Sequence, residues 1–236
     1  MTMTITLAFL ACLMAAVLWW LLRQSFDVRP WAVQGAAVQD VYAGVLARPP
    51  AKTALIVFLA VATSLFALFI SAYAMRIQFG DWRPLPEPRL LTWNTMVLVL
   101  ASVALQWAVY AARRGDEARL RSGLAAGGAL AALFLAGQLL VWKQMSDAGF
   151  YVASSAATGF FYLLTAVHGA HVAGGLVAWG RTVSRAWRGA PAARLQLGIE
   201  LCAIYWHFLL LIWVVLFAVL SSDALGMAIC SSSATL

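Results

Sequence analysis

The chain has 236 residues, of which 64% are hydrophobic and 11% are charged. Ordinary globular domains are about 45–50% apolar and about 25% charged, so this composition excludes a typical soluble fold and predicts a lipid-facing surface. The net charge of +7 does not indicate a nucleic-acid partner. The basic residues lie in short connections between apolar runs, as they do in membrane proteins.

Six apolar segments are long enough to cross a hydrocarbon core of about 30 Å as helices. In chain order they are Ile5–Leu22, Thr53–Met75, Thr92–Ala112, Leu124–Trp142, Ala156–Gly180 and Gly198–Leu220. All seven prolines lie outside them, and proline interrupts helices because it lacks an amide donor. Strands of a membrane barrel would be shorter and would alternate in polarity. The sequence therefore predicts an all-α integral membrane protein with six transmembrane helices, an N-terminal helix followed by a five-helix body.

The positions of the basic residues predict how these helices are oriented. Twelve of the 16 Lys and Arg residues lie near the connections after the first, third and fifth segments, and four lie on the other face. Basic residues concentrate on the cytoplasmic side of membrane proteins. We therefore expect both termini to be periplasmic.

The fifth segment carries two histidines, His168 and His171, which are three residues apart and so share one face of a helix. Neutral imidazoles on one face can bind a metal ion or a haem. The alternative, which we favour, is that each ring forms a hydrogen bond with a neighbouring helix or a lipid headgroup.

The sixth segment holds Glu200, Tyr205, Trp206 and His207 inside an apolar run. Ionisable groups at bilayer depth cost at least a few kcal/mol and usually face protein. Glu200 and His207 are seven residues apart and share one face. A buried carboxylate can relay protons. We favour an ion pair between Glu200 and a cytoplasmic arginine such as Arg194, because Glu200 lies near the start of the span.

Other polar and small residues in the spans indicate contacts between helices. Amides and hydroxyls at these depths usually join helices by hydrogen bonds, and the candidates are Asn94, Thr95, Gln106 and Gln138. Small residues permit close approach of helices, and these are Gly123, Gly127, Gly128 and Ala132, followed by Ala170, Gly174 and Ala178. The sequence contains no P-loop, HExxH, GxSxG or CxxC motif. These residues alone predict an accessory membrane protein.

Four stretches also carry a family resemblance. They read PPAKTALIVFLAVATSLFALFISAYAMR at 49–76, PLPEPRLLTWNTMVLVLASVALQWA at 84–108, GQLLVWKQMSDAGFYVASSAATGFFYLLTAVHGAHVAGG at 137–175 and IELCAIYWHFLLLIW at 199–213. The order Glu…Tyr-Trp-His-Phe…Trp in the fourth stretch and the whole third stretch are the more specific matches. The chain resembles subunit III of the haem–copper terminal oxidases, the cytochrome c and quinol oxidases, over residues 49–220. Residues 1–48 then form an N-terminal transmembrane helix with a cytoplasmic loop, and residues 221–236 form a periplasmic tail.

The resemblance implies a non-catalytic subunit of the bacterial inner membrane. It implies no catalytic residue, metal or cofactor in this chain, with haem and copper held by partner subunits. The implied partners are subunit I by direct packing, subunit II, a small subunit IV and bound phospholipid. The residues that would then lie in the interior or in a lipid cleft are His168, His171, Glu200, Tyr205, Trp206 and His207.

Two departures from the family pattern limit what the resemblance implies. Where the family commonly has a membrane-buried glutamate after a serine, this chain has Val61-Ala62, and where the family often has Val-Asp after Tyr-Trp-His-Phe, it has Leu209-Leu210. A contribution to proton supply is therefore not implied, whereas packing and lipid binding are. The alternatives are a subunit-III-like protein of nitric oxide reductase, which is typically shorter, a haem-binding electron carrier of the membrane, and a small transporter.

Overall fold

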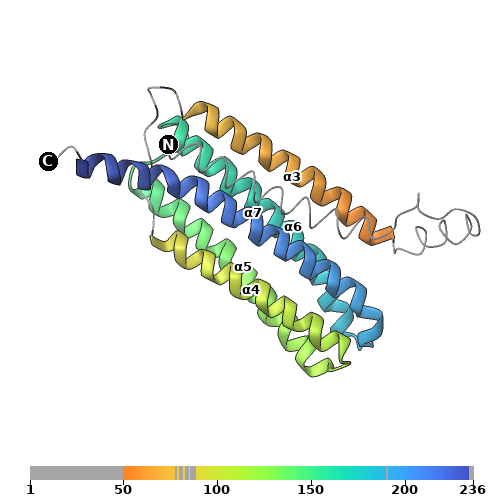
Figure 1. The fold of residues 1–236 in the computed structure, drawn as a ribbon. Helices are drawn as coiled ribbons and strands as arrows, with labels where there is room; N and C mark the ends of the chain where they lie inside the picture. Colours follow the sequence, from red (N-terminus) through yellow and green to blue (C-terminus); the bar gives the residue numbers. More distant parts are fainter. Residues whose placement is uncertain are drawn as a thin grey trace, which may run out of the picture. The chain divides into compact units, whose positions relative to one another are not determined.

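The computed structural model describes residues 50–77, 79, 82, 85, 89–189 and 191–233. The predicted helix at Ile5–Leu22, and with it the predicted total of six, lies outside these residues. The described residues form α-helices and their connections, without a β-strand. The helices, shown in Figure 1, are α3 (Pro50–Arg76), α4 (Arg89–Arg113), α5 (Glu117–Asp147), α6 (Ala156–Trp187) and α7 (Ala192–Ser233). Each is long and apolar enough to cross a membrane, which confirms the predicted helical class and five of the six predicted helices.

The helices are longer than the apolar segments that predicted them, and their polar caps explain why. The segment predicted at Leu124–Trp142 belongs to the 31-residue α5, whose N-cap Asp116 accepts a hydrogen bond from the Arg119 amide at 3.0 Å. At the start of α6, Ser155 and Thr158 form a capping box. Such caps satisfy the free amides of a first turn. A helix therefore continues through polar turns that a count of apolar residues leaves out.

The chain divides into two compact units, residues 1–64 and residues 65–236. The described part of the first unit is the beginning of α3. There Thr63 Oγ1 donates to the Leu59 carbonyl at 2.7 Å and Ser64 Oγ donates to the Ala60 carbonyl at 3.0 Å. Both hydroxyls thus bond to the preceding turn of their own helix, as mid-helix Ser and Thr residues commonly do.

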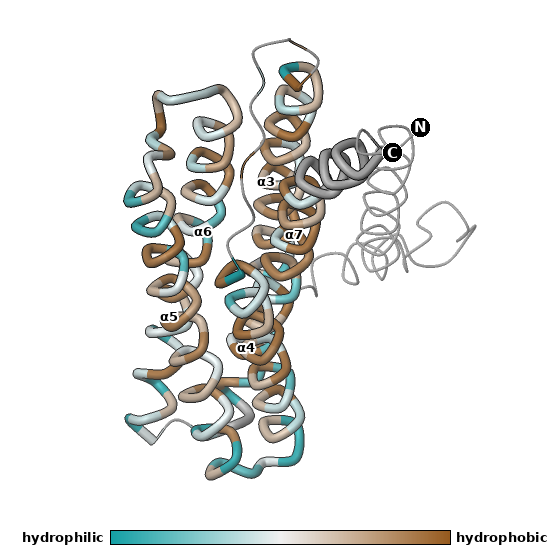
Figure 2. Tube along the Cα trace, turned by 90° about the vertical axis from the view of Figure 1, so that its left-hand side faces the viewer, coloured by the Kyte–Doolittle hydropathy of each residue, from teal (hydrophilic) through white to brown (hydrophobic). Residues whose placement is uncertain are grey.

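The second unit contains the remainder of α3 and the helices α4 to α7. In it α4 lies along α5, α7 packs against both α4 and α6, and α6 also contacts α5. Figure 2 shows that hydrophobic residues run along the helices and that hydrophilic residues gather toward the helix ends. The largest side chains of its fully buried core are Trp206, Trp213, Phe66 and Phe134. Aromatic side chains thus fill the space where α7 meets its neighbours.

Small residues set the distance between α4 and α5, as predicted. A Cβ atom on Gly123 would lie 3.1 Å from the backbone nitrogen of Ala108, and one on Gly127 would lie 2.6 Å from Leu105 Cγ. For Gly174 the structure gives no such contact in the part of the chain that it describes. Among the described residues nothing lies within 4 Å of a Cβ built there, and the glycine of α6 that meets α7 is Gly175. A one-residue error rotates a position by about 100° around a helix, which moves it from one face to another.

Candidate functional site

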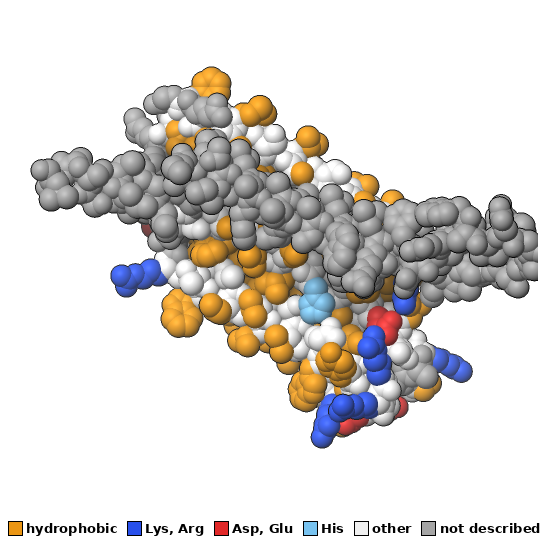
Figure 3. Space-filling view, in the orientation of Figure 1, with side chains coloured by type: hydrophobic (Ala, Val, Ile, Leu, Met, Phe, Trp, Pro, Cys, Tyr) orange, Lys and Arg blue, Asp and Glu red, His pale blue; other side chains and the backbone are white. Residues whose placement is uncertain are grey.

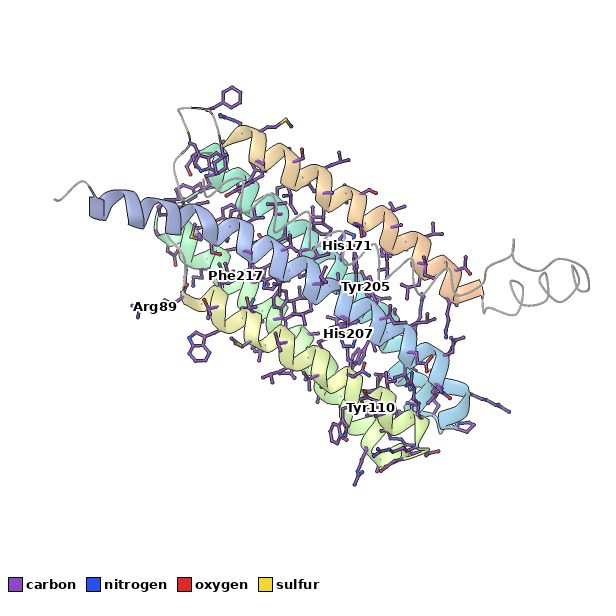
Figure 4. The ribbon with its side chains drawn as sticks, in the orientation of Figure 1. Arg89, Tyr110, His171, Tyr205, His207 and Phe217 are labelled. Carbon is purple, nitrogen blue, oxygen red and sulfur yellow. The ribbon has the colours of Figure 1, made fainter. Side chains whose placement is uncertain are left out.

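Three consecutive residues of α7, Tyr205, Trp206 and His207, face two different helices. Successive residues are rotated by about 100° around a helix. The Tyr205 and Trp206 rings lie where a Cβ atom on Gly175 of α6 would stand, at 2.7 Å and 2.9 Å. Figure 4 shows His207 on the side of α7 that faces α4. The Tyr-Trp-His sequence therefore joins α7 to both of its neighbours at one level of the bundle.

Both ring nitrogens of His207 are hydrogen-bonded to side chains of α4. Nδ1 bonds to Ser102 Oγ, and Nε2 lies 2.9 Å from Gln106 Oε1. An amide oxygen can only accept, so Nε2 carries the proton and donates, while Nδ1 accepts from the Ser102 hydroxyl. The imidazole is then neutral, and its one ring lone pair, on Nδ1, accepts the hydrogen bond from Ser102. This geometry makes His207 a link between helices, and it leaves no ring lone pair to ligate iron or copper.

Two further contacts extend this link along the whole of α4. Toward one end Trp213 Nε1 donates to Thr95 Oγ1 at 2.9 Å. Toward the other, Arg113 and Glu200 form an ion pair, with 3.1 Å between Nη2 and Oε1. We call this row the polar seam; it consists of the pairs Thr95–Trp213, Ser102–His207, Gln106–His207 and Arg113–Glu200. The predicted common face of Glu200 and His207 is the face that meets α4.

The predicted partner of Glu200 requires a correction. An arginine does neutralise this carboxylate, but it is Arg113 at the end of α4 rather than Arg194 in the first turn of α7. The antiparallel packing of α4 and α7 brings position 113 alongside position 200, and the sequence alone does not show that pairing. Gln196 Nε2, one turn away on α7, also donates to Glu200 Oε1 at 3.4 Å.

The two histidines of α6 make different contacts, although three residues separate them. His168 is fully buried, and its Nε2 donates to the Leu209 carbonyl of α7 at 3.1 Å. His171 is half-buried, and its Nδ1 donates to the Val167 carbonyl of its own helix at 2.8 Å. The favoured expectation, a bond to a neighbouring helix or a lipid headgroup, fits His168, whereas the Nδ1 bond of His171 stays within α6. Among the described residues, no group of three or more His, Cys, Asp and Glu side chains is placed to hold a metal ion.

The Tyr205 hydroxyl and the indole of Trp206 complete the contact between α6 and α7. Tyr205 donates to the His171 carbonyl at 2.9 Å, and Trp206 is fully buried. Within the described part of the chain, two buried nitrogens near this contact have no hydrogen-bond partner, Trp206 Nε1 and His168 Nδ1. The stabilisation from aromatic packing between α6 and α7 therefore exceeds the cost of leaving these two buried nitrogens without a partner.

Other predicted polar residues also join helices. Asn94 Nδ2 donates to the Phe134 carbonyl of α5 at 3.1 Å and lies 3.5 Å from Gln138 Oε1. Thr95 and Gln106 belong to the polar seam. Sequence reasoning did not single out Ser102 as a site residue. Its position four residues before Gln106, and so on the same helical face, is the signal that identifies it.

Comparison with known proteins identifies the family to which this chain is similar. The model of the family described as cytochrome c oxidase subunit III matches residues 1–222. A probable cytochrome c oxidase subunit 3 of Mycobacterium bovis is 33% identical over 159 residues, which cover 66% of this chain and 77% of that protein. The cytochrome c oxidase subunit 3 of Corynebacterium diphtheriae is 30% identical over 157 residues, or 65% and 76%. That of a Synechocystis species is 29% identical over 171 residues, or 69% and 71%.

Proposed function

Because the chain belongs to the cytochrome c oxidase subunit III family, we propose that it is the non-catalytic subunit III of a bacterial haem–copper oxidase. The family match over residues 1–222 carries this proposal, and it confirms the resemblance found in the four sequence stretches. Membership places the chain in a multi-subunit oxidoreductase complex, and five long apolar helices fit a multi-pass membrane protein.

We propose that the complex reduces O2 to water in aerobic respiration and couples this reaction to proton pumping. Haem and copper would be held by the partner subunits, and this chain would pack against subunit I. Subunit II and a small subunit IV would be its other neighbours. The geometry of His207 supports a role without metal ligation, because both of its ring nitrogens bond to side chains of α4. His168 bonds to α7 through Nε2 alone.

The proposed contribution of this chain is to stabilise subunit I and to hold phospholipid. It would lie in the bacterial inner membrane with both termini periplasmic, because basic residues favour the cytoplasmic side. A proton-supply role is not part of the proposal. The positions where the family commonly carries acidic groups are here Val61-Ala62 and Leu209-Leu210.

The proposal is tested by purifying the affinity-tagged chain from its native membrane in a mild detergent. Mass spectrometry identifies its partners, and a reduced-minus-oxidised spectrum detects haem. We expect large haem-bearing and copper-bearing subunits, oxidase activity, and a colourless chain once it is separated from them. A separated chain that keeps its own haem band would refute the proposal in favour of an electron carrier. Co-purification with a nitric oxide reductase would assign the chain to that enzyme instead.

A further inference from the structure

The side-chain amide of Gln106 has an unused donor group at bilayer depth. Its Oε1 accepts from His207, but among the described residues Nε2 has no hydrogen-bond partner. Gln106 and His207 are both half-buried, so this end of their contact opens on the outer surface of the α4–α7 pair. His207 lies midway along the apolar span Arg194–Ser221.

An unpaired amide at this depth needs an acceptor. Hydrocarbon offers no hydrogen bonds, so a free N–H group facing lipid tails is destabilising. The ester and phosphate oxygens of a phospholipid lie at the edges of the bilayer, more than a turn away from the middle of a span. Polar side chains inside membranes usually face protein or a water-filled cavity. A protein neighbour that brings an acceptor to Gln106 removes the penalty.

The surface around Gln106 has the composition of a helix contact. Val103 and Tyr110 of α4 are 60% and 52% exposed, and Val214 of α7 is 39% exposed. Figure 3 shows hydrophobic side chains gathered on this side of the molecule, with a histidine exposed among them. Helix association in membranes combines close apolar packing with a few hydrogen bonds between helices. One polar donor inside an apolar strip fits that pattern.

A basic residue, Arg114, lies at the cytoplasmic end of the apolar surface around Gln106. Arg114 lies in the turn directly after the last residue of α4, four residues beyond Tyr110. It is exposed, and it has no ion-pair partner among the described residues. A neighbour with an acidic residue at this end would complement it.

We propose that the outer flank of the polar seam, formed by Val103, Gln106, Tyr110, His207 and Val214, is the docking surface for a transmembrane helix of a partner oxidase subunit. This helix is apolar, presents a hydrogen-bond acceptor to Gln106 at mid-bilayer depth, and carries an acidic residue near Arg114. The inference rests on the proposed function, because the partner is taken from the same oxidase complex.

Photo-crosslinking in the intact complex tests the location of this surface. A benzophenone amino acid replaces Val103 or Val214, and Val177 of α6 is the control, since Val103 and Val177 are each 60% exposed. We expect crosslinks from positions 103 and 214 to a mapped transmembrane segment of an oxidase subunit, and none from position 177. Adducts with lipid alone, with a second copy of this chain or within this chain overturn the inference, as do equal yields at all three positions.

A pair of substitutions tests the hydrogen bond itself. Gln106→Met removes the amide donor, whereas Ser102→Ala removes the other His207 bond and leaves the amide in place. We expect Gln106→Met to increase dissociation of the chain from the purified oxidase about three- to tenfold, the effect of one interhelical hydrogen bond, and Ser102→Ala to leave it near wild type. Equal effects, or no effect of Gln106→Met, contradict the inference. If the wild-type chain does not co-purify with oxidase subunits, the proposed function fails; if it does and crosslinks are absent, only this inference fails.

Discussion

Helix α7 is held against α4 and against α6 by two contacts of different chemistry. Along the polar seam with α4, each contact joins two side chains, as in Ser102–His207 and Arg113–Glu200. Against α6, two hydrogen bonds go from side chains to backbone carbonyls, from His168 to Leu209 and from Tyr205 to His171. A weak contact between side chains, with 3.7 Å between Thr182 Oγ1 and Cys202 Sγ, and the packing of rings against Gly175 add to it.

The two kinds of hydrogen bond have different consequences. Bonds between two side chains fix the register of two helices, whereas bonds to backbone carbonyls hold helices together without fixing it. A carbonyl is present at every residue, so a side chain that slips by one turn can find another acceptor. A side-chain pair exists at one register only. In a membrane, where burial of apolar surface does not drive helices together, packing and hydrogen bonds are the main attractive terms. We infer that the ring packing against α6 supplies most of the stability and that the polar seam selects the register of α4.

Removal of the Trp206 indole is the strongest test of the packing half of this comparison. Trp206 is fully buried, so Trp206→Ala leaves a large cavity and should lower the free energy of unfolding by about 3–5 kcal/mol. SDS titration of the purified chain in mixed micelles measures this quantity. Trp107→Ala is the control, because the Trp107 side chain is 48% exposed; an equal loss from both variants would contradict the assignment.

An added side chain at Gly175 tests the same contact from the side of α6. A Cβ atom there would lie 2.7 Å from Tyr205 Cε1 and 2.9 Å from Trp206 Cζ3. Gly175→Val should therefore cost about 1–3 kcal/mol through overpacking. Gly174→Val is the matched control, since among the described residues nothing lies within 4 Å of that position. The same SDS titration should find it within about 0.5 kcal/mol of wild type.

The sequence predicted the helices well, because a membrane span is a local property of about 20 apolar residues. It also identified His207, Gln106, Thr95 and Glu200 as polar residues that deserved a partner. The partners themselves could not be predicted, since Gln106 and His207 are separated by 101 residues in the chain. Only the antiparallel packing of α4 and α7 places them together. The same reason explains why the predicted arginine partner of Glu200 is Arg113 and not the example named, Arg194, which is near Glu200 in the chain.

Small residues were predicted as a class, but their faces were not. Gly123, Gly127 and Gly128 do meet neighbouring helices, whereas Gly174 does not meet one in the described part of the chain. Spacing alone gives two candidate faces when glycines are adjacent, as Gly174 and Gly175 are. The large ring of Trp206 on the opposite helix decides which glycine is required.

Loss of the His207 imidazole tests the polar half of the comparison. His207→Ala removes two hydrogen bonds between α4 and α7, and such bonds contribute about 0.6 kcal/mol each and rarely above 1.7 kcal/mol. The expected loss of unfolding free energy is about 1–2 kcal/mol, which is smaller than the loss expected for Trp206→Ala. Assembly with the oxidase or retention of lipid should weaken, while the haem spectrum of the complex stays unchanged. Disappearance of a haem band would instead make His207 a ligand.

Of the contacts tested, the ion pair between Arg113 and Glu200 should contribute least to the free energy of unfolding. The Arg113 side chain is 54% exposed and that of Glu200 is 18% exposed, and exposed ion pairs are worth about 0–1 kcal/mol because solvent screens them. We expect Glu200→Gln to shorten the lifetime of the enzyme during turnover more than it lowers the initial rate, because it loosens the end of the seam and leaves catalytic groups untouched. The number of turnovers before inactivation and the initial O2 uptake rate measure the two effects.

The double variant shows whether Glu200 acts through its partner. If the carboxylate serves the seam, Arg113→Gln should shorten the lifetime by itself, and adding Glu200→Gln should have a smaller effect than it has in the wild-type chain, because the pair is already broken. Arg119→Gln, which breaks the ion pair of α5 with its N-cap Asp116, is the control and should leave the lifetime at the wild-type value. An immediate collapse of proton pumping in Glu200→Gln alone, with Arg113→Gln unaffected, would show that the carboxylate moves protons and would remove it from the seam's structural role.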